Sequence, residues 1–285
     1  MTRAQVRDLE APIGVFDSGL GGLTVVRAIS EALPHEKLLY LGDTARVPYG
    51  TRSAHTVVRY ARGCGALLAN RGIKMLVVAC NTVSAVALDM LRVELDMPVL
   101  GVIEPGARAA VRASQTGRIG VIATAGTVAS GAYPRGVSSV DTRAEVKQLA
   151  APLLVPLAEE GWLEGEVPHL VLQRYLEKLL GAGSEIDTLV LGCTHYPLLS
   201  EVIADEATRL RGAPISIVDS GVAAAGELAT LLRERNLLRQ RDSSERSEGG
   251  ALELMVTDRP ERFAEVASRF LGRDLESLDV QQVDL

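Results

Sequence analysis

The sequence predicts an α/β fold with two similar α/β domains, mainly parallel sheets and an active-site cleft between the domains. Short, continuously apolar runs rich in β-branched residues alternate with longer helical stretches, a pattern typical of parallel sheets covered by helices on both faces. The segment Phe16-Asp17-Ser18-Gly19 is echoed in the second half by Val218-Asp219-Ser220-Gly221. The length of 285 residues suits one large domain or two ordinary ones.

The apolar runs predict the strands, and amphipathic or polar stretches between most of them predict helices. Because active sites in parallel sheets lie at the carboxyl ends of strands, we expect functional side chains directly after these runs. Segment 252–256 is expected to be folded as well. The predicted strands are 13–16, 37–41, 74–79, 99–102, 118–122, 188–191 and 215–218, and the clearest helices are 22–33, 52–70 and 260–271.

Composition excludes several classes of protein. Hydrophobic residues make up 47% and charged residues 23% of the chain, as in globular proteins. The net charge of −6 and the pI of about 5.4 provide no basic field for nucleic acid or an anionic membrane. Three cysteines do not suggest a disulfide framework, residues 1–11 lack a signal peptide, and no apolar run is long enough to span a membrane. These features predict a cytoplasmic protein.

Cys80 and Cys193 each stand directly after an apolar strand and before a polar segment that is predicted to start a helix. A helix N-terminus favours a thiolate because its free amides carry partial positive charge. One such cysteine is usually a small core residue, but two in matched contexts indicate a pair of thiols that face one substrate. Cys64 lies within the predicted helix 52–70 and is expected to be structural.

Two polar residues near these cysteines are further candidates. His195 follows Cys193 by two positions and is either a proton donor and acceptor near neutral pH or a structural histidine. Asp17 ends the first strand before a glycine-rich turn, and it is either a catalytic carboxylate or a helix cap. Two thiols with such neighbours suit proton transfer on both faces of one carbon atom.

Neither a metal nor an organic cofactor is expected. A zinc site needs three or four ligands at recognisable spacing, and one cysteine–histidine pair does not supply them. A pyridoxal-phosphate enzyme needs a lysine near the carboxyl ends of its strands. Lys74 instead opens a strand, and Lys147 and Lys178 are predicted on helix surfaces.

Four motifs carry a resemblance that covers nearly the whole chain, from Gly14 to about Leu232. They are Gly14-Val15-Phe16-Asp17-Ser18-Gly19-Leu20-Gly21-Gly22, Gly42-Asp43-Thr44 with Pro48-Tyr49-Gly50, Ala79-Cys80-Asn81-Thr82, and Gly192-Cys193-Thr194-His195-Tyr196-Pro197-Leu198. In these motifs and their order the sequence resembles the glutamate racemases of the aspartate/glutamate racemase family, which supply D-glutamate for bacterial peptidoglycan.

The resemblance implies a cofactor-independent mechanism in which Cys80 and Cys193 are the acid–base pair. Asp17 matches the family's carboxylate near the first cysteine, and His195 matches its histidine near the second. Glu159 matches the glutamate that supports the second cysteine, and the alignment of segment 154–161 favours it over its neighbour in the chain.

The resemblance also implies substrate contacts, a domain division and a homodimer. The domain with Cys80 would hold residues 1–102 and 214–285, and the domain with Cys193 would hold 103–213. Val83 stands where alanine is common and would narrow the pocket, and the stretch 239–250 reads as an exposed inserted loop. The implied substrate contacts are Ser18, Pro48, Tyr49, Gly50, Asn81, Thr82, Thr124 and Thr194.

Racemisation needs one group to remove the α-proton and another to return a proton to the opposite face, since a single rigid base cannot do both. Asn81, Thr82 and Thr194 would hold the substrate carboxylate and leave both faces open to sulfur. The prediction is therefore a racemase with L- and D-glutamate as its small-molecule substrates. Two alternatives stay open: a racemase of the same fold that acts on aspartate or a related acid, and a non-catalytic two-lobed protein that closes on an acidic ligand.

Overall fold

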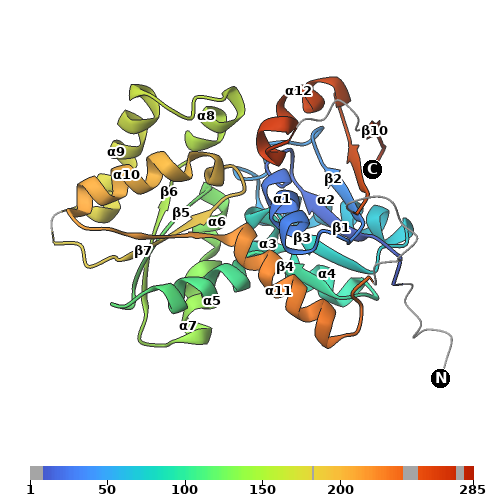
Figure 1. The fold of residues 1–285 in the computed structure, drawn as a ribbon, viewed down its shortest axis with the longest axis horizontal. Helices are drawn as coiled ribbons and strands as arrows, with labels where there is room; N and C mark the ends of the chain where they lie inside the picture. Colours follow the sequence, from blue (N-terminus) through green and yellow to red (C-terminus); the bar gives the residue numbers. More distant parts are fainter. Residues whose placement is uncertain (1–8, 182, 240–249, 274–278) are drawn as a thin grey trace.

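Two parallel sheets, one in each of two lobes that lie side by side, organise the chain in the computed structural model (Figure 1). The structure describes residues 9–181, 183–239, 250–273 and 279–285. The first sheet has the strand order β10-β9-β2-β1-β3-β4, and the second has the order β6-β5-β7-β8. Every strand pairing among these residues is parallel. The predicted α/β class with two mainly parallel sheets is confirmed.

All the predicted strands are present, with ends that differ by one residue. The first sheet contains β1 (Ile13–Asp17), β2 (Leu38–Gly42), β3 (Met75–Val78), β4 (Val99–Gly101), β9 (Leu252–Val256) and β10 (Val280–Gln282). The second contains β5 (Arg118–Ala123), β6 (Glu145–Ala150), β7 (Thr188–Gly192) and β8 (Ser216–Asp219). Strands β6 and β10 were not predicted, because both are edge strands without a continuous apolar run. The prediction that placed Lys147 on a helix was wrong, since it lies in β6.

Helices cover both faces of each sheet, so the central strands are buried on both sides. Among the described residues, no helix combines the length and the apolar character that a bilayer-spanning segment requires. The first lobe contains α1 (Leu23–Ala32), α2 (Ala54–Asn70), α3 (Asn81–Val86), α4 (Leu88–Glu94), α11 (Ser220–Glu234) and α12 (Pro260–Leu271). The second contains α5 (Ile103–Ala113), α6 (Ala125–Ser130), α7 (Ala132–Val140), α8 (Leu154–Glu160), α9 (Glu166–Leu180), the 3-10 helix η1 (Tyr196–Leu199) and α10 (Ser200–Arg211).

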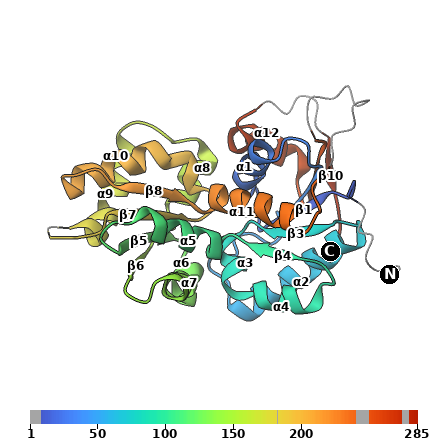
Figure 2. The same ribbon diagram turned by 60° about the horizontal axis from the view of Figure 1, so that its bottom comes forward.

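The chain passes from the first lobe to the second through α5 and returns through α11, and these two helices lie side by side at the centre of the molecule (Figure 2). Strand β8 pairs with β7, so the second sheet extends beyond the predicted boundary at residue 213. The return therefore falls at the start of α11 rather than at residue 214. The division into two domains remains a prediction. Of the predicted loop 239–250, residues 240–249 lie outside the described part of the chain.

The two echoed Asp-Ser-Gly segments have different surroundings. The Asp219 carboxylate accepts hydrogen bonds from the amides of Gly221 (2.7 Å) and Val222 (3.3 Å), and so caps the start of α11. Asp17 lies instead in a buried turn, where its Oδ2 accepts from the amide of Gly19 at 2.9 Å. Similar sequences at two strand ends therefore serve different local purposes.

One charged pair is buried at the amino ends of the strands in the first sheet. Lys74 Nζ lies 2.6 Å from Glu36 Oε2, and the two side chains are 0% and 2% exposed. The same ammonium donates to the carbonyl oxygens of Leu9 and Leu237, each at 2.9 Å. Lys74 thus joins three segments that are far apart in the sequence and lies away from the carboxyl ends of the strands.

We expect Lys74→Met to lower the free energy of unfolding by about 3–5 kcal/mol, because it leaves the Glu36 carboxylate buried without its partner. Chemical denaturation followed by circular dichroism measures this loss. Arg62→Met is the matched control, since the Arg62–Glu94 pair is exposed to solvent and should contribute little. Equal, small effects of the two substitutions would contradict the assigned role of the buried pair.

Candidate active site

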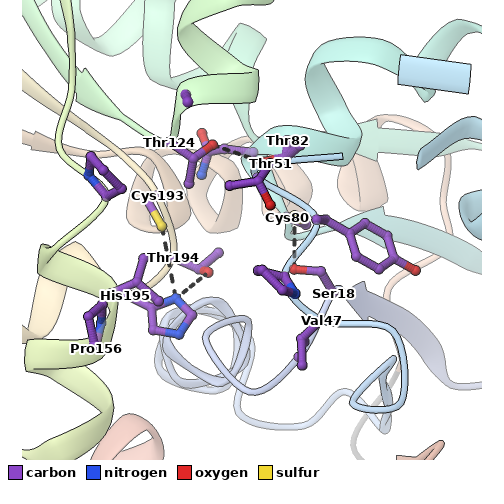
Figure 3. A pocket seen from close by; sticks show the side chains of 18 of the residues that line it. Ser18, Val47, Thr51, Cys80, Thr82, Thr124, Pro156, Cys193, Thr194 and His195 are labelled. Carbon is purple, nitrogen blue, oxygen red and sulfur yellow. Dashed lines mark hydrogen bonds between the residues drawn. The ribbon is translucent and has the colours of Figure 1, made fainter. Parts of the chain in front are cut away.

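A cavity of about 280 Å³ is lined by residues from both lobes, at the carboxyl ends of β1 and β3 in one sheet and of β5 and β7 in the other. Cys80 follows β3 and Cys193 follows β7, and both side chains line the cavity. Figure 3 shows the two cysteines on opposite sides of it. The sequence predicted functional side chains at the carboxyl ends of the strands, and at these ends the two sheets approach each other.

All the predicted site residues except Asp17 line this cavity. They are Cys80, Cys193, His195, Glu159, Ser18, Pro48, Tyr49, Gly50, Asn81, Thr82, Thr124 and Thr194. Asp17 lies behind the Ser18 turn, and its carboxyl group is 1% exposed. Burial raises the pKa of Asp17, while the charge of His195 and the amides of the turn oppose this rise.

The wall from the first lobe carries Cys80, which is the N-cap residue of α3. Its Sγ lies 3.4 Å from Ser18 Oγ. Burial, the negative charge of Asp17 and, more weakly, that of Cys193 raise the pKa of Cys80 to about 12, although the Ser18 hydroxyl and the Val83 amide favour the thiolate. The expected lowering by a helix N-terminus is therefore outweighed, and Cys80 is a neutral thiol at pH 7.

The wall from the second lobe carries Cys193, which is followed by a turn and η1, so the predicted helix start directly after it was wrong. His195 Nδ1 lies 3.9 Å from Cys193 Sγ, and Nε2 lies 3.0 Å from Glu159 Oε1. Burial lowers the pKa of His195, but Cys193 and Glu159 together raise it to about 10. At pH 7 His195 is therefore an imidazolium that lies between the Cys193 sulfur and the Glu159 carboxylate. The neighbouring Glu160 is exposed.

The His195 ring contacts two elements of the first lobe. A Cβ atom on Gly21 would lie 2.4 Å from His195 Nδ1, so only glycine permits this approach. The Phe270 ring of α12 meets the imidazole edge to face, with centroids 5.3 Å apart. Thr24 Oγ1 also donates to the carbonyl oxygen of Thr194 at 2.8 Å. Sequence reasoning missed these contacts, because nothing in the local sequence indicates which residues meet across the lobes.

A cluster of hydroxyl groups forms the third part of the lining. Thr82 Oγ1 lies 2.9 Å from Thr124 Oγ1 (Figure 3). The buried Thr127 Oγ1 lies 3.3 and 3.1 Å from these two atoms. Thr124 is also the N-cap of α6 and accepts from the Thr127 amide at 3.4 Å. No lysine or arginine lines the cavity among the described residues, so hydroxyls and backbone amides are its neutral donors. In the same part of the chain, no cluster of three or more histidine, cysteine and acidic side chains is arranged to hold a metal ion.

The loop with Pro48, Tyr49 and Gly50 is held by the buried Asp43. The Tyr49 hydroxyl donates to Asp43, whose carboxylate also lies 2.7 Å from Arg46 Nε. The Tyr49 ring is 1% exposed, and burial raises its pKa. The Gly126 amide donates to the carbonyl oxygen of Gly50 at 2.8 Å, which links the loop to α6 of the other lobe. Asp43 stood in a recognised motif, but the sequence did not reveal this anchoring role.

Two parallel-sheet lobes, with a thiol on each side of a shared cavity, are the architecture of an amino-acid racemase, which is an isomerase. A family model described as Asp/Glu/Hydantoin racemase matches residues 13–228. The chain belongs to this family.

Individual relatives are similar over nearly their whole length. A glutamate racemase from Geobacter metallireducens is 50% identical over 273 residues, which cover 96% of both chains. The crystal structure of a glutamate racemase isoform from Bacillus anthracis superposes with a TM-score of 0.87 at 37% identity, covering 96% of this chain and 98% of that one. A glutamate racemase from Francisella tularensis, crystallised in complex with D-glutamate, has a TM-score of 0.84 at 34% identity and covers 95% and 97% of the two chains.

The raised pKa of His195 predicts how stability depends on pH. The pKa is about 10 in the folded protein, against an ordinary value of 6.5, so the folded state binds this proton more tightly. The resulting stabilisation is fully present below about pH 6.5 and is lost as the pH rises through about 10. We therefore expect the difference in free energy of unfolding between the parent and His195→Gln to shrink from pH 7 to pH 10. Denaturation at a series of pH values measures it, and a constant difference would refute the assigned environment of His195.

Proposed function

We propose that the protein interconverts L- and D-glutamate without a cofactor, and that Cys80 and Cys193 exchange protons with opposite faces of the α-carbon. One observation carries the proposal: a cysteine from each lobe lines the same cavity, and the two lie on opposite sides of it. Full-length relatives that are named glutamate racemase, one of them crystallised with D-glutamate, support the choice of substrate.

The proposed reaction transfers one proton at each face. A thiolate on one side takes the α-proton, so the Cα–H bond breaks and an S–H bond forms. The electron pair left on the α-carbon is shared with the adjacent carboxylate. The thiol on the other side then gives its proton to the opposite face of the carbon and becomes the thiolate. After one turnover the two sulfur atoms have exchanged protonation states, and the return reaction uses them in reverse.

The surroundings of the two cysteines favour different starting roles. Cys80 is the neutral thiol at pH 7 and is the proton donor of the resting enzyme. Cys193 Sγ lies 3.9 Å from Nδ1 of His195. Cys193 is proposed to be the base that acts first, because Cys80 holds its proton. Glu159 keeps His195 protonated and oriented, and Asp17 is proposed to act through its charge on Cys80.

The substrate is proposed to be held by neutral donors. Thr82, Thr124 and Thr194 place hydroxyl groups at the cavity, and the segment Pro48-Tyr49-Gly50 lines it opposite the second lobe. Since the Tyr49 hydroxyl is bonded to Asp43, this segment would bind the substrate through its backbone. Hydrogen bonds in an enclosed, water-poor cavity strengthen as negative charge develops on the carboxylate.

The cellular role proposed here rests on the family relationship. The product D-glutamate would supply peptidoglycan synthesis in the cytoplasm, and the protein would form a homodimer. A racemase acting on aspartate is the nearer alternative, and a two-lobed binding protein without catalysis is the more distant one. The relatives named glutamate racemase favour glutamate over aspartate.

We expect Cys80→Ser and Cys193→Ser each to lower racemisation of both glutamate enantiomers by about 10²–10⁴-fold, the usual contribution of a general acid or base. Circular dichroism follows the reaction, with aspartate measured in parallel. Cys64→Ser is the matched control, because Cys64 is buried in α2 and does not line the cavity. Full activity in either site variant would remove that cysteine from the mechanism. Binding of glutamate without entry of solvent deuterium at the α-carbon would favour the binding protein.

Glu159 and Glu160 form a second matched pair. We expect Glu159→Gln to lower kcat by about tenfold or more, because a hydrogen bond to a charged group contributes about 1.5–3 kcal/mol. Glu160→Gln should leave kcat unchanged, since that side chain is exposed and does not line the cavity. Steady-state rates in both directions measure the effect. The reverse result would move the supporting role to Glu160.

A further inference from the structure

Tyr133 lies between the two cysteine-bearing segments without lining the cavity. It belongs to α7 in the second lobe and is completely buried. Its hydroxyl donates to Asn81 Oδ1 at 2.7 Å. Asn81 follows Cys80 directly and opens α3 in the first lobe. This hydrogen bond therefore joins the second lobe to the residue next to one of the two cysteines.

The ring of Tyr133 meets the segment that carries the other cysteine. A Cβ atom on Gly192, the residue before Cys193, would lie 3.0 Å from Tyr133 Cε2. The ring thus packs closely against Gly192, and a side chain at this position would crowd it. One side chain therefore contacts the chain neighbour of Cys80 through its hydroxyl and that of Cys193 through its ring.

A second buried connection runs parallel to this one. Asn81 Nδ2 donates to Ser220 Oγ at 3.4 Å, and Ser220 Oγ donates to the carbonyl oxygen of Leu191 at 3.0 Å. Leu191 lies in β7, two residues before Cys193. Both ends of the Asn81 side-chain amide are therefore bonded inside the protein. Its Oδ1 bonds to Tyr133 of the second lobe, and its Nδ2 bonds to Ser220 of the crossover helix α11.

We propose that Tyr133 is a positioning residue, which holds the sulfur atoms of Cys80 and Cys193 at the separation that proton transfer to one α-carbon requires. The inference rests on the proposed function, because it concerns the two thiols of that mechanism. Each thiol is fixed to a different sheet, so their separation is set by contacts between the lobes. Small misplacements of reacting groups are costly, and buried hydrogen bonds that bridge the lobes restrict such movement.

A tyrosine that only fills the core of the second lobe would need its ring but not its hydroxyl. Tyr133→Phe separates these roles, because it keeps the ring on Gly192 and removes only the hydroxyl group, which bonds to Asn81 and also interacts with Ser220. We expect kcat to fall by about tenfold in both directions, part of the hundredfold that a misplaced reacting group can cost, with KM changed less than about twofold.

Hydrogen exchange supplies a readout that a loss of folded protein does not alter. The parent and Tyr133→Phe are incubated with L-glutamate in D2O, and deuterium is measured at the α-carbon of the recovered L-glutamate and of the D-glutamate formed. If the thiol that protonates the opposite face is displaced, the α-carbanion lives longer. The thiol that removed the α-proton can then exchange its proton with D2O and return a deuteron to the face from which the proton was taken, which gives deuterated L-glutamate. The ratio of deuterium in recovered substrate to product formed should therefore rise in the variant.

Tyr196→Phe is the matched control. Tyr196 is an equally buried tyrosine of the second lobe, and its hydroxyl donates to the carbonyl oxygen of Ala151 within that lobe, at 2.8 Å. It should lose similar stability but keep the parent kcat and exchange ratio. Parent values in Tyr133→Phe, or equal losses of kcat in both variants with an unchanged exchange ratio, would overturn the inference alone. A parent that racemises no acidic amino acid would refute the proposed function and this inference together.

Discussion

Contact between the lobes is the constraint on which the rest of the site depends. Each cysteine is fixed at the end of a strand in its own sheet, so neither sheet alone can build the cavity. The sheets are held together by hydrogen bonds that cross between them, among them those from Thr24 to Thr194 and from Gly126 to Gly50. The bond from Thr24 to Thr194 is partly buried, and breaking such a bond without replacing it leaves its polar groups with fewer partners. The chemistry therefore depends on contacts that lie outside the reacting atoms.

The balance between burial and nearby charges determines the protonation state of the ionisable groups Cys80 and His195 at the cavity. For Cys80, burial and the nearby Asp17 act together, and the thiol keeps its proton. For His195, burial lowers the pKa, but the contacts with Cys193 and Glu159 raise it by more, and the charged form is favoured. Both cysteines directly follow a strand, yet the ionisable groups of the two walls differ in their protonation states. This difference follows from which side chains the other elements bring to each wall.

The sequence revealed the parts of the fold that depend on local pattern. Apolar runs located the central strands to within one residue, and side chains directly after them pointed to the cavity edge. The edge strand β6 escaped because exposed residues such as Glu145 interrupt its apolar pattern. Tyr133 and Gly21 escaped for another reason, since their importance arises only where distant segments meet. The sequence also did not reveal how deeply Cys80 is buried. For this reason its position at a helix N-terminus did not predict its protonation state correctly.

The scarcity of positive charge around the cavity also has a consequence for how a ligand arrives. The chain carries a net charge of −6, and among the described residues that line the cavity the His195 imidazolium is the only cationic side chain. An acidic ligand, as the proposed reaction requires, would therefore approach against a weak long-range repulsion and would meet the attraction of His195 only at the cavity. Dissolved salt screens that repulsion, so physiological ionic strength eases the encounter instead of slowing it. In the proposed function, selectivity for an acidic ligand would then arise after entry, from His195 and from the geometry of the hydroxyl and amide donors.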